Sequence, residues 1–223
     1  MKSAPLAIVI LLVLFCFPAS AQTVLPDDGE VLSGVYINNF FNLSIEYPKD
    51  WVVHGDEINQ RIRDRAKEEA AKSGTLAQQK NVYLLFTVSR YPRGQQPAGV
   101  NSTILVIAEN MAQWPRSTNA KEYLLDVRAA KQRRGVQALL KEPVAVQFSG
   151  LQFFRDDFSH EVDGVSMKQS VFVTLRKGYA LTFSFLGEDE KGLAELVKTM
   201  NTILPLAARP GSQPEPPSGR KPD

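Results

Sequence analysis

The sequence predicts an α+β domain with a central antiparallel sheet and helices on both faces of that sheet. Short segments in which apolar and polar residues alternate, separated by turn residues, are typical of strands. Three segments, 56–72, 119–134 and 189–204, instead place apolar residues at helical spacing. Several predicted strands are apolar on both faces, so the sheet requires cover from two sides. The expected architecture is therefore an α/β/α sandwich.

Residues 1–21 have the features of a removable secretory signal peptide. Lys2 gives a positive start, an apolar run covers 6–17, and small residues precede a cleavage site between Ala21 and Gln22. A membrane anchor is the alternative, but the apolar run is about a dozen residues long and a spanning helix needs roughly 20. We therefore expect an exported protein, periplasmic or secreted, with no stable membrane anchor after cleavage.

Composition excludes several classes of chemistry. The one cysteine, Cys16, lies inside the predicted signal peptide, so the exported form would have no disulfide, thiolate metal site or cysteine nucleophile. Lipidation of Cys16 is disfavoured because the large residue Phe15 precedes it. The net charge of +2 predicts no general affinity for nucleic acid. About 200 remaining residues, in a chain that is 43% hydrophobic, are enough for one domain with its own core.

The domain is expected to occupy residues 34–205. Residues 22–33 are polar and rich in turn formers, which predicts a flexible lead-in. The last helix, over 189–204, begins with acidic residues and is expected to end at Pro205. Residues 206–223 contain Pro, Gly, Ser and charged residues without periodicity, which predicts a disordered tail.

The first part of the domain is expected to contain short strands and one charged helix. Strands are predicted over 35–37, 43–47 and 51–53, joined by turns. The helix over 56–72 has no Pro or Gly inside it, and Gly74 follows its end. Its apolar stripe is narrow and made of small residues, so we expect it to pack loosely at an edge of the core and to move.

The middle of the domain is expected to contain buried strands and a capped helix. The segments 82–89 and 103–108 are apolar on both alternating faces, as strands buried from two sides are. Asn119 is a suitable helix cap, and Glu122 three residues later completes a capping pattern. Gly135 is expected to end this helix.

The strongest strand pattern covers residues 143–186. Turn residues at 163–164 and 177–178 divide it into antiparallel segments. Counting from the second turn places Phe172 opposite Phe183 on one face of the sheet. This part of the sheet therefore needs cover on both sides.

The segment 38–51, NNFFNLSIEYPKDW, resembles the opening of the PsbP and Mog1-like superfamily, in which a short strand precedes a Gly-Phe-Ser-Ile, Tyr-Pro, any two, Trp pattern. The residues that match are Phe41, Leu43, Ser44, Ile45, Tyr47, Pro48 and Trp51. Asn42 stands where that group usually has Gly. The resemblance implies a Mog1/PsbP-like fold and a non-enzymatic binding or accessory domain. No ligand-binding residue carries over, because the matching positions look like core and turn positions.

Two histidines, His54 and His160, are the candidates for imidazole chemistry. His160 shares a strand face with Asp156, but four residues along a strand separate them by roughly 13 Å. His54 precedes Asp56 and Glu57, which suit a metal only if other groups join them, and Asp56 equally suits a helix cap. We expect no catalytic residue, metal or cofactor. A small-ligand or metal-dependent activity in a cleft near either histidine is the alternative.

Basic residues gather where the second predicted helix ends. Arg128, Lys131, Arg133 and Arg134 either complement the helix dipole or contact an acidic partner or lipid headgroups. Trp114, ahead of that helix, either packs over the sheet edge or joins the basic residues as an exposed aromatic anchor. We expect a non-catalytic binding or accessory domain whose partner is a protein or a small ligand. Peripheral contact with an acidic surface through the basic helix end is the other alternative.

Overall fold

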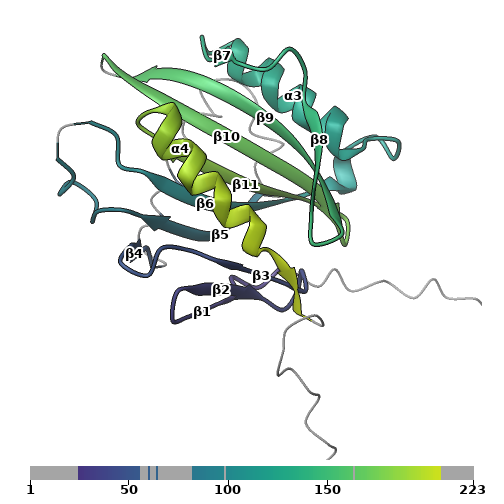
Figure 1. The fold of residues 1–223 in the computed structure, drawn as a ribbon. Helices are drawn as coiled ribbons and strands as arrows, with labels where there is room; N and C mark the ends of the chain where they lie inside the picture. The colour runs from purple at the N-terminus through teal and green to yellow at the C-terminus, as the bar shows by residue number, and fades with distance from the viewer. Residues whose placement is uncertain are drawn as a thin grey trace, which may run out of the picture.

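The computed structural model describes residues 25–55, 60, 64, 82–97, 99–162 and 164–206 (Figure 1). The predicted signal peptide with its cleavage site, most of the predicted helix 56–72, and the chain beyond residue 206 lie outside the described residues. Within 56–72, Gln60 and Asp64 are described. Both are helical, and the Gln60 amide donates a 2.9 Å hydrogen bond to the Asp64 carboxylate.

The described part of the chain is mostly β. Its strands are β1 (Glu30–Leu32), β2 (Val35–Asn38), β3 (Leu43–Glu46), β4 (Val52–Val53), β5 (Val82–Ser89), β6 (Thr103–Asn110), β7 (Gln137–Ala138), β8 (Val144–Phe148), β9 (Leu151–Val162), β10 (Val165–Arg176), β11 (Tyr179–Gly187) and β12 (Leu204–Pro205). Its helices are the α-helices α3 (Ala120–Gln132) and α4 (Glu190–Val197) and the 3-10 helices η1 (Met111–Gln113) and η2 (Lys198–Thr202). Within the described ranges, no helix is long and apolar enough to cross a membrane.

The strands form two antiparallel sheets, so the predicted antiparallel sheet is present and a second, smaller sheet accompanies it. The smaller sheet has the order β1-β2-β3-β12. The larger, eight-stranded sheet has the order β4-β5-β6-β11-β10-β9-β7, and β8 also pairs with β9. In the smaller sheet Leu204 of β12 pairs with Ser44 of β3. Because that pairing joins the two ends of the domain, no local pattern of alternation could predict it.

The ends of the domain also differ from the prediction. Glu30–Leu32 pairs with β2, so strand structure begins inside the segment that was expected to be a flexible lead-in. The hairpin between β1 and β2 turns at Ser33 and Gly34, which have φ values of 48° and 87°, as a tight hairpin turn requires. Near the other end, α4 stops at Val197, and Pro205 lies in β12 instead of terminating a helix.

The register predicted across the 177–178 turn is confirmed, and the strands on either side of residues 163–164 pair in the same antiparallel manner. Phe172 lies opposite Phe183 across β10 and β11, and Gln169 lies opposite Phe158 across β10 and β9. The β10–β11 turn places Lys177 at a φ of 50°, the left-handed region that a two-residue hairpin turn demands. These registers are local, because the turn between two strands determines which residues face each other.

Two apolar clusters form the core, and they divide the side chains of β10 between them. Phe172 packs in the first cluster, which includes side chains of α4. Its neighbours Val171 and Val173 pack in the second, which includes side chains of α3. Successive side chains of a strand point to opposite faces, so both faces of the larger sheet are buried here. In Figure 1, α4 crosses one side of this sheet and α3 runs beside β9.

Candidate functional site along helix α3

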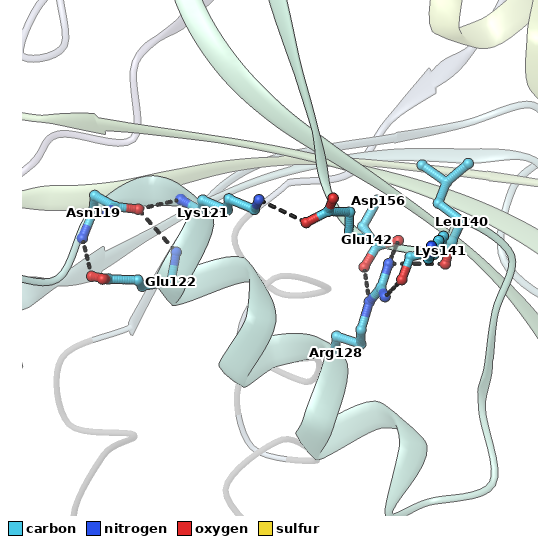
Figure 2. A network of polar contacts seen from close by, with 8 residues as sticks. All are labelled: Asn119, Lys121, Glu122, Arg128, Leu140, Lys141, Glu142 and Asp156. Atoms are coloured by element: carbon cyan, nitrogen blue, oxygen red, sulfur yellow. Dashed lines mark hydrogen bonds and ion pairs between the residues drawn. The ribbon is translucent and has the colours of Figure 1, made fainter.

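Helix α3 begins where the sequence predicts, at a capping box on Asn119 (Figure 2). The Asn119 side-chain oxygen accepts hydrogen bonds of 2.9 and 3.0 Å from the backbone N–H groups of Lys121 and Glu122. The Glu122 carboxylate accepts a 2.9 Å bond from the Asn119 N–H. Lys121 also pairs with Glu142 at 2.8 Å. The first turn is therefore held firmly at the N-terminal end of α3.

Arg128 anchors α3 on the sheet, so it is set apart from the other residues of the predicted basic patch. Its guanidinium donates to both oxygens of Asp156, at 2.6 and 2.7 Å, and Asp156 is fully buried. It also donates to the carbonyl oxygens of Leu140 and Lys141 (Figure 2). The bonds to Asp156 raise the pKa of Arg128. With 9% exposure and its donors in use, Arg128 acts within the fold.

The sequence contained a signal for this pair. Asp156 lies between Phe154 and Phe158 on one face of a predicted buried strand. A carboxylate in such surroundings requires a cationic partner, because burying an unpaired charge is costly. The shared strand face of Asp156 and His160 drew attention to His160 as a partner instead. No nearby residue in the sequence indicated that Arg128 would approach Asp156.

Lys131 and His160 meet at one oxygen atom on the same face of the sheet. The Lys131 ammonium donates to Gln169 Oε1 at 2.7 Å, and His160 Nε2 lies 2.8 Å from the same oxygen. The Gln169 amide nitrogen donates to the Ser184 hydroxyl at 2.7 Å, which orients the amide. A carbonyl oxygen only accepts, so His160 carries its proton on Nε2. The Lys131 nitrogen also lies 5.0 Å from the centre of the Phe158 ring.

Burial weakens the charged forms of both groups. The pKa of Lys131 is lowered to about 8, mainly by burial, with the nearby charge of Arg134 adding to the decrease and Asp156 opposing it. Burial also lowers the pKa of His160, with the bond to Gln169 opposing and the charge of Lys131 adding to the effect. The predicted basic patch thus separates into buried Arg128, partly buried Lys131, and exposed Arg133 and Arg134.

Trp114 lies near the other end of α3, between η1 and the capping box. Its indole N–H donates to Glu109 Oε1 at 3.1 Å, and the Tyr123 hydroxyl donates to Glu109 Oε2 at 2.7 Å. The Trp114 and Tyr123 ring centres are 5.1 Å apart. Burial raises the pKa of Glu109, and these two hydrogen bonds oppose the rise. Trp114 is thus fixed as a partly buried ring packed against the second cluster.

An open groove of about 670 Å³ runs beside Trp114. One wall comes from the segment after β6 and the other from the β10–β11 turn, and the Met111 N–H joins them by donating to the Gly178 carbonyl. The residues that line it include Met111, Trp114, Arg116, Leu175, Arg176 and Lys177. None of its lining residues in the described part of the chain is acidic. We call this feature the Trp114 groove.

The Trp114 groove and the basic helix end are separate sites. A helix rises 1.5 Å per residue, and Trp114 packs on Tyr123, so the ten residues from Tyr123 to Arg133 separate Trp114 from Arg133 by about 15 Å. The structure therefore does not join Trp114 to the basic residues of the helix end. It brings Arg116, Arg176 and Lys177 to the groove instead. The sequence did not indicate these three, because the β10–β11 turn and the 111–118 segment are far apart in the chain.

His54 is held inside the fold at the opposite edge of the larger sheet. Its Nε2 lies 2.6 Å from the Ser89 hydroxyl, which itself donates to the Tyr91 carbonyl at 2.7 Å. The hydroxyl proton is thus in use, so His54 donates to Ser89 and does not activate it. Burial, followed by the charge of Arg93, lowers the pKa of His54.

The two histidines do not share a cleft. The strand order places β4 and β9 five strand positions apart, roughly 24 Å at the usual spacing. Among the residues that the structure describes, no three His, Cys, Asp or Glu side chains are grouped so as to hold a metal ion. The alternative of a single histidine-based site would therefore have to use His54 or His160 alone.

No protein-family model matches the chain, and no curated protein matches it in sequence. Three solved structures show a similar fold. Cyanobacterial PsbP (CyanoP) from Synechocystis sp. PCC 6803 is 11% identical, with 79% of this chain and 95% of that one covered and a TM-score of 0.43. LpqN, described as involved in cell envelope biogenesis of Mycobacterium tuberculosis, is 13% identical, with 80% and 85% covered and a TM-score of 0.42.

The third is a protein from Bacteroides thetaiotaomicron VPI-5482, which is 15% identical with a TM-score of 0.41. The matched region covers 83% of this chain and 52% of the Bacteroides protein, so this chain spans about half of that protein's length. The similar structures thus include a PsbP protein, from the group that the 38–51 segment resembles. At these identities the likeness concerns the fold alone.

Proposed function

We propose that this chain is an exported, non-catalytic accessory domain that binds a protein partner through the Trp114 groove. The observation that carries the proposal is the groove itself, which combines a fixed aromatic ring with the cations Arg116, Arg176 and Lys177. Tryptophan and arginine are enriched among the residues that dominate protein binding. The cations favour a partner with an acidic surface at the point of contact.

The candidate catalytic side chains are held by hydrogen bonds and ion pairs within the fold, which supports a binding role over a catalytic one. His54 donates to Ser89, and His160 donates to Gln169. Arg128 is paired with Asp156. Each of these groups is engaged in a contact within the fold, and the Ser89 hydroxyl beside His54 donates its proton to the Tyr91 carbonyl. A small-ligand or metal-dependent activity near either histidine stays an untested alternative.

Export is supported by the sequence of residues 1–21. The positive start, short apolar run and small residues before Gln22 match a cleaved secretory signal, and they favour a periplasmic or secreted protein. Protein recovered from the exported fraction of the host should begin at Gln22 by mass spectrometry. Recovery of the uncleaved chain in the membrane fraction would contradict this part of the proposal.

We also infer that α3 and α4 cover opposite faces of the larger sheet. Leu124 of α3 shares a cluster with Val171, whereas Leu193 of α4 shares a cluster with Phe172. Adjacent strand residues point to opposite faces, which supports the sandwich arrangement for this part of the sheet. A spin label on each helix should show a separation that spans the sheet.

Affinity capture tests the binding role. The tagged wild-type protein should recover the same partner repeatedly from the exported fraction, and the double variant Arg116→Gln/Arg176→Gln should lose most of it. Arg133→Gln is the matched control, because it removes an exposed cation at the far end of α3. Trp114→Phe should keep the ring packing while removing the N–H and part of the contact area. The proposal fails if folded wild-type protein recovers no reproducible partner, or if the double variant recovers as much as the wild type does.

A further inference from the structure

Two side chains able to carry positive charge converge on a single neutral acceptor. Lys131 of α3 and His160 of β9 both donate to Gln169 Oε1 of β10, at 2.7 and 2.8 Å. Gln169 is 8% exposed, and its amide is fixed by Ser184 of β11. The acceptor is therefore a rigid part of the sheet, whereas Lys131 and His160 are partly exposed.

Neither of these side chains has an anionic partner among the residues that the structure describes. Within the described ranges, no carboxylate forms a salt bridge with Lys131 or His160. Asp156 acts on Lys131 at a distance, but both of its oxygens bind Arg128. The ionisable groups around the pair include Arg128 on α3, Arg134 just after α3, Asp156 and Glu161 on β9, and Lys168 on β10.

These neighbours leave the position electropositive. Lys168 donates to the Ser159 hydroxyl at 3.2 Å, on the opposite face of the sheet from Gln169. Glu161 is adjacent to His160 on the strand, so its exposed side chain points to that opposite face as well. Arg134 acts on Lys131 as a like charge. The Lys131 and His160 nitrogens are partly buried and share only the neutral Gln169 oxygen as an acceptor. A negatively charged acceptor would stabilise their protonated forms more strongly.

We propose that Lys131 and His160 form a binding site for an oxyanion, either a carboxylate or a phosphate group. The Lys131 ammonium has three N–H donors, and one of them reaches Gln169, so others are available for a ligand. His160 gains a second donor at Nδ1 when it is protonated. The exposed Arg133 and Arg134 at the same end of α3 favour the approach of an anion.

Binding at this site is coupled to protonation. An anion favours the charged forms of both Lys131 and His160, so it raises both pKa values, and by linkage it binds more tightly as the pH falls. His54 lies far across the sheet and does not respond. The site is at the other end of α3 from the Trp114 groove, so its test is independent of the proposed function.

Nuclear magnetic resonance titration of the two imidazoles in the full chain tests the proposal directly. The sequence contains 2 histidines, so His54 serves as an internal reference. Sodium phosphate, sodium acetate and a short glutamate-rich peptide are each compared with sodium chloride at the same ionic strength. We expect at least one oxyanion to raise the His160 pKa by about half a unit or more, roughly a threefold gain in proton affinity, while His54 is unchanged.

The probes identify the source of the anion. A response to the peptide and acetate alone indicates a protein carboxylate, and a response to phosphate alone indicates a phosphate ligand. A response to all three supports a general oxyanion site. No response of His160, an equal response to chloride, or equal shifts of both histidines would overturn the proposal.

Two variants keep the test decisive. Lys131→Gln should weaken binding of the responsive anion about tenfold and remove the His160 shift, because a charge-assisted contact is lost. Lys191→Gln, at an exposed cation on α4, should retain the shift. If Lys131→Gln does not fold, His160→Gln replaces one donor with another, and calorimetry should then show anion binding that no longer depends on pH between 5 and 7. Undiminished, pH-dependent binding in that variant would refute the assignment.

Discussion

Replacing Lys131 with methionine should make the protein more stable at neutral pH. The substitution keeps an unbranched apolar stem over the Phe158 ring and removes a charge that burial disfavours. Lys131 has a pKa of about 8 where a lysine ordinarily has 10.5, which corresponds to roughly 3 kcal/mol. Partial exposure reduces this to about 1–3 kcal/mol. Losing the hydrogen bond to Gln169 offsets about 1 kcal/mol, so a net gain of up to about 2 kcal/mol is expected.

The pH dependence gives this prediction a definite sign. The folded pKa of Lys131 lies below its unfolded value, so the unfolded chain binds more protons between about pH 8 and 10.5. The wild type should therefore gain stability as the pH rises through that window, relative to Lys131→Met. Comparing the two proteins cancels the opposite effect of buried tyrosines such as Tyr36, whose pKa burial raises.

Urea unfolding at pH 7 and pH 9.5 is the appropriate assay. At pH 7 Lys131→Met should have the higher midpoint, and at pH 9.5 the difference should shrink. The matched control Arg133→Met removes an exposed cation from the same helix end and should change the free energy of unfolding by less than about 0.5 kcal/mol. The reasoning is refuted if Lys131→Met is less stable than the wild type at pH 7, or if the difference between them is the same at both pH values.

Three further predictions concern the polar contacts of α3 and the histidines. Asp156→Ala should cost about 3–5 kcal/mol of unfolding free energy because it leaves Arg128 buried without its partner, and Arg128→Met/Asp156→Leu should recover most of that loss. A double variant no more stable than Asp156→Ala would contradict the pairing argument. Asn119→Ala should lower the free energy of unfolding in urea by about 1 kcal/mol, because it removes the capping box. An unchanged midpoint would show that the capping box does not contribute to stability. Below pH 6.5 the melting temperature should fall, because His54 and His160 have lowered folded pKa values and the unfolded chain takes up protons first. His160→Gln should reduce that acid sensitivity, and an identical pH profile would contradict it.

Several features of the fold follow from residues that are close together in the chain. The cap at Asn119 was predictable because its partner Glu122 is three residues away. The pairing of Phe172 with Phe183 was predictable because one tight turn links their strands. In both cases the physical cause acts over a few residues, so a single sequence is sufficient to reveal it.

The contacts at the proposed binding surfaces instead join residues that are far apart in the chain. Arg128 meets Asp156 across 28 positions of the chain, and Lys131 meets Gln169 across 38. The sequence therefore grouped Arg128 with the other cations of the helix end without indicating its pairing with Asp156. It left open whether Trp114 packs over the sheet edge or joins those cations, and the structure shows it packed against the second cluster.

By itself, the sequence determined that the chain forms antiparallel strands, where its second helix begins, and that one side of α3's end would be basic. Only the tertiary structure decided that there are two sheets, that Arg128 is buried, and that Lys131 and His160 share an acceptor. The physical reason is that alternation and capping are properties of neighbouring residues. The meeting of distant charges depends instead on how helices and strands pack, and that is settled by burial of the whole core.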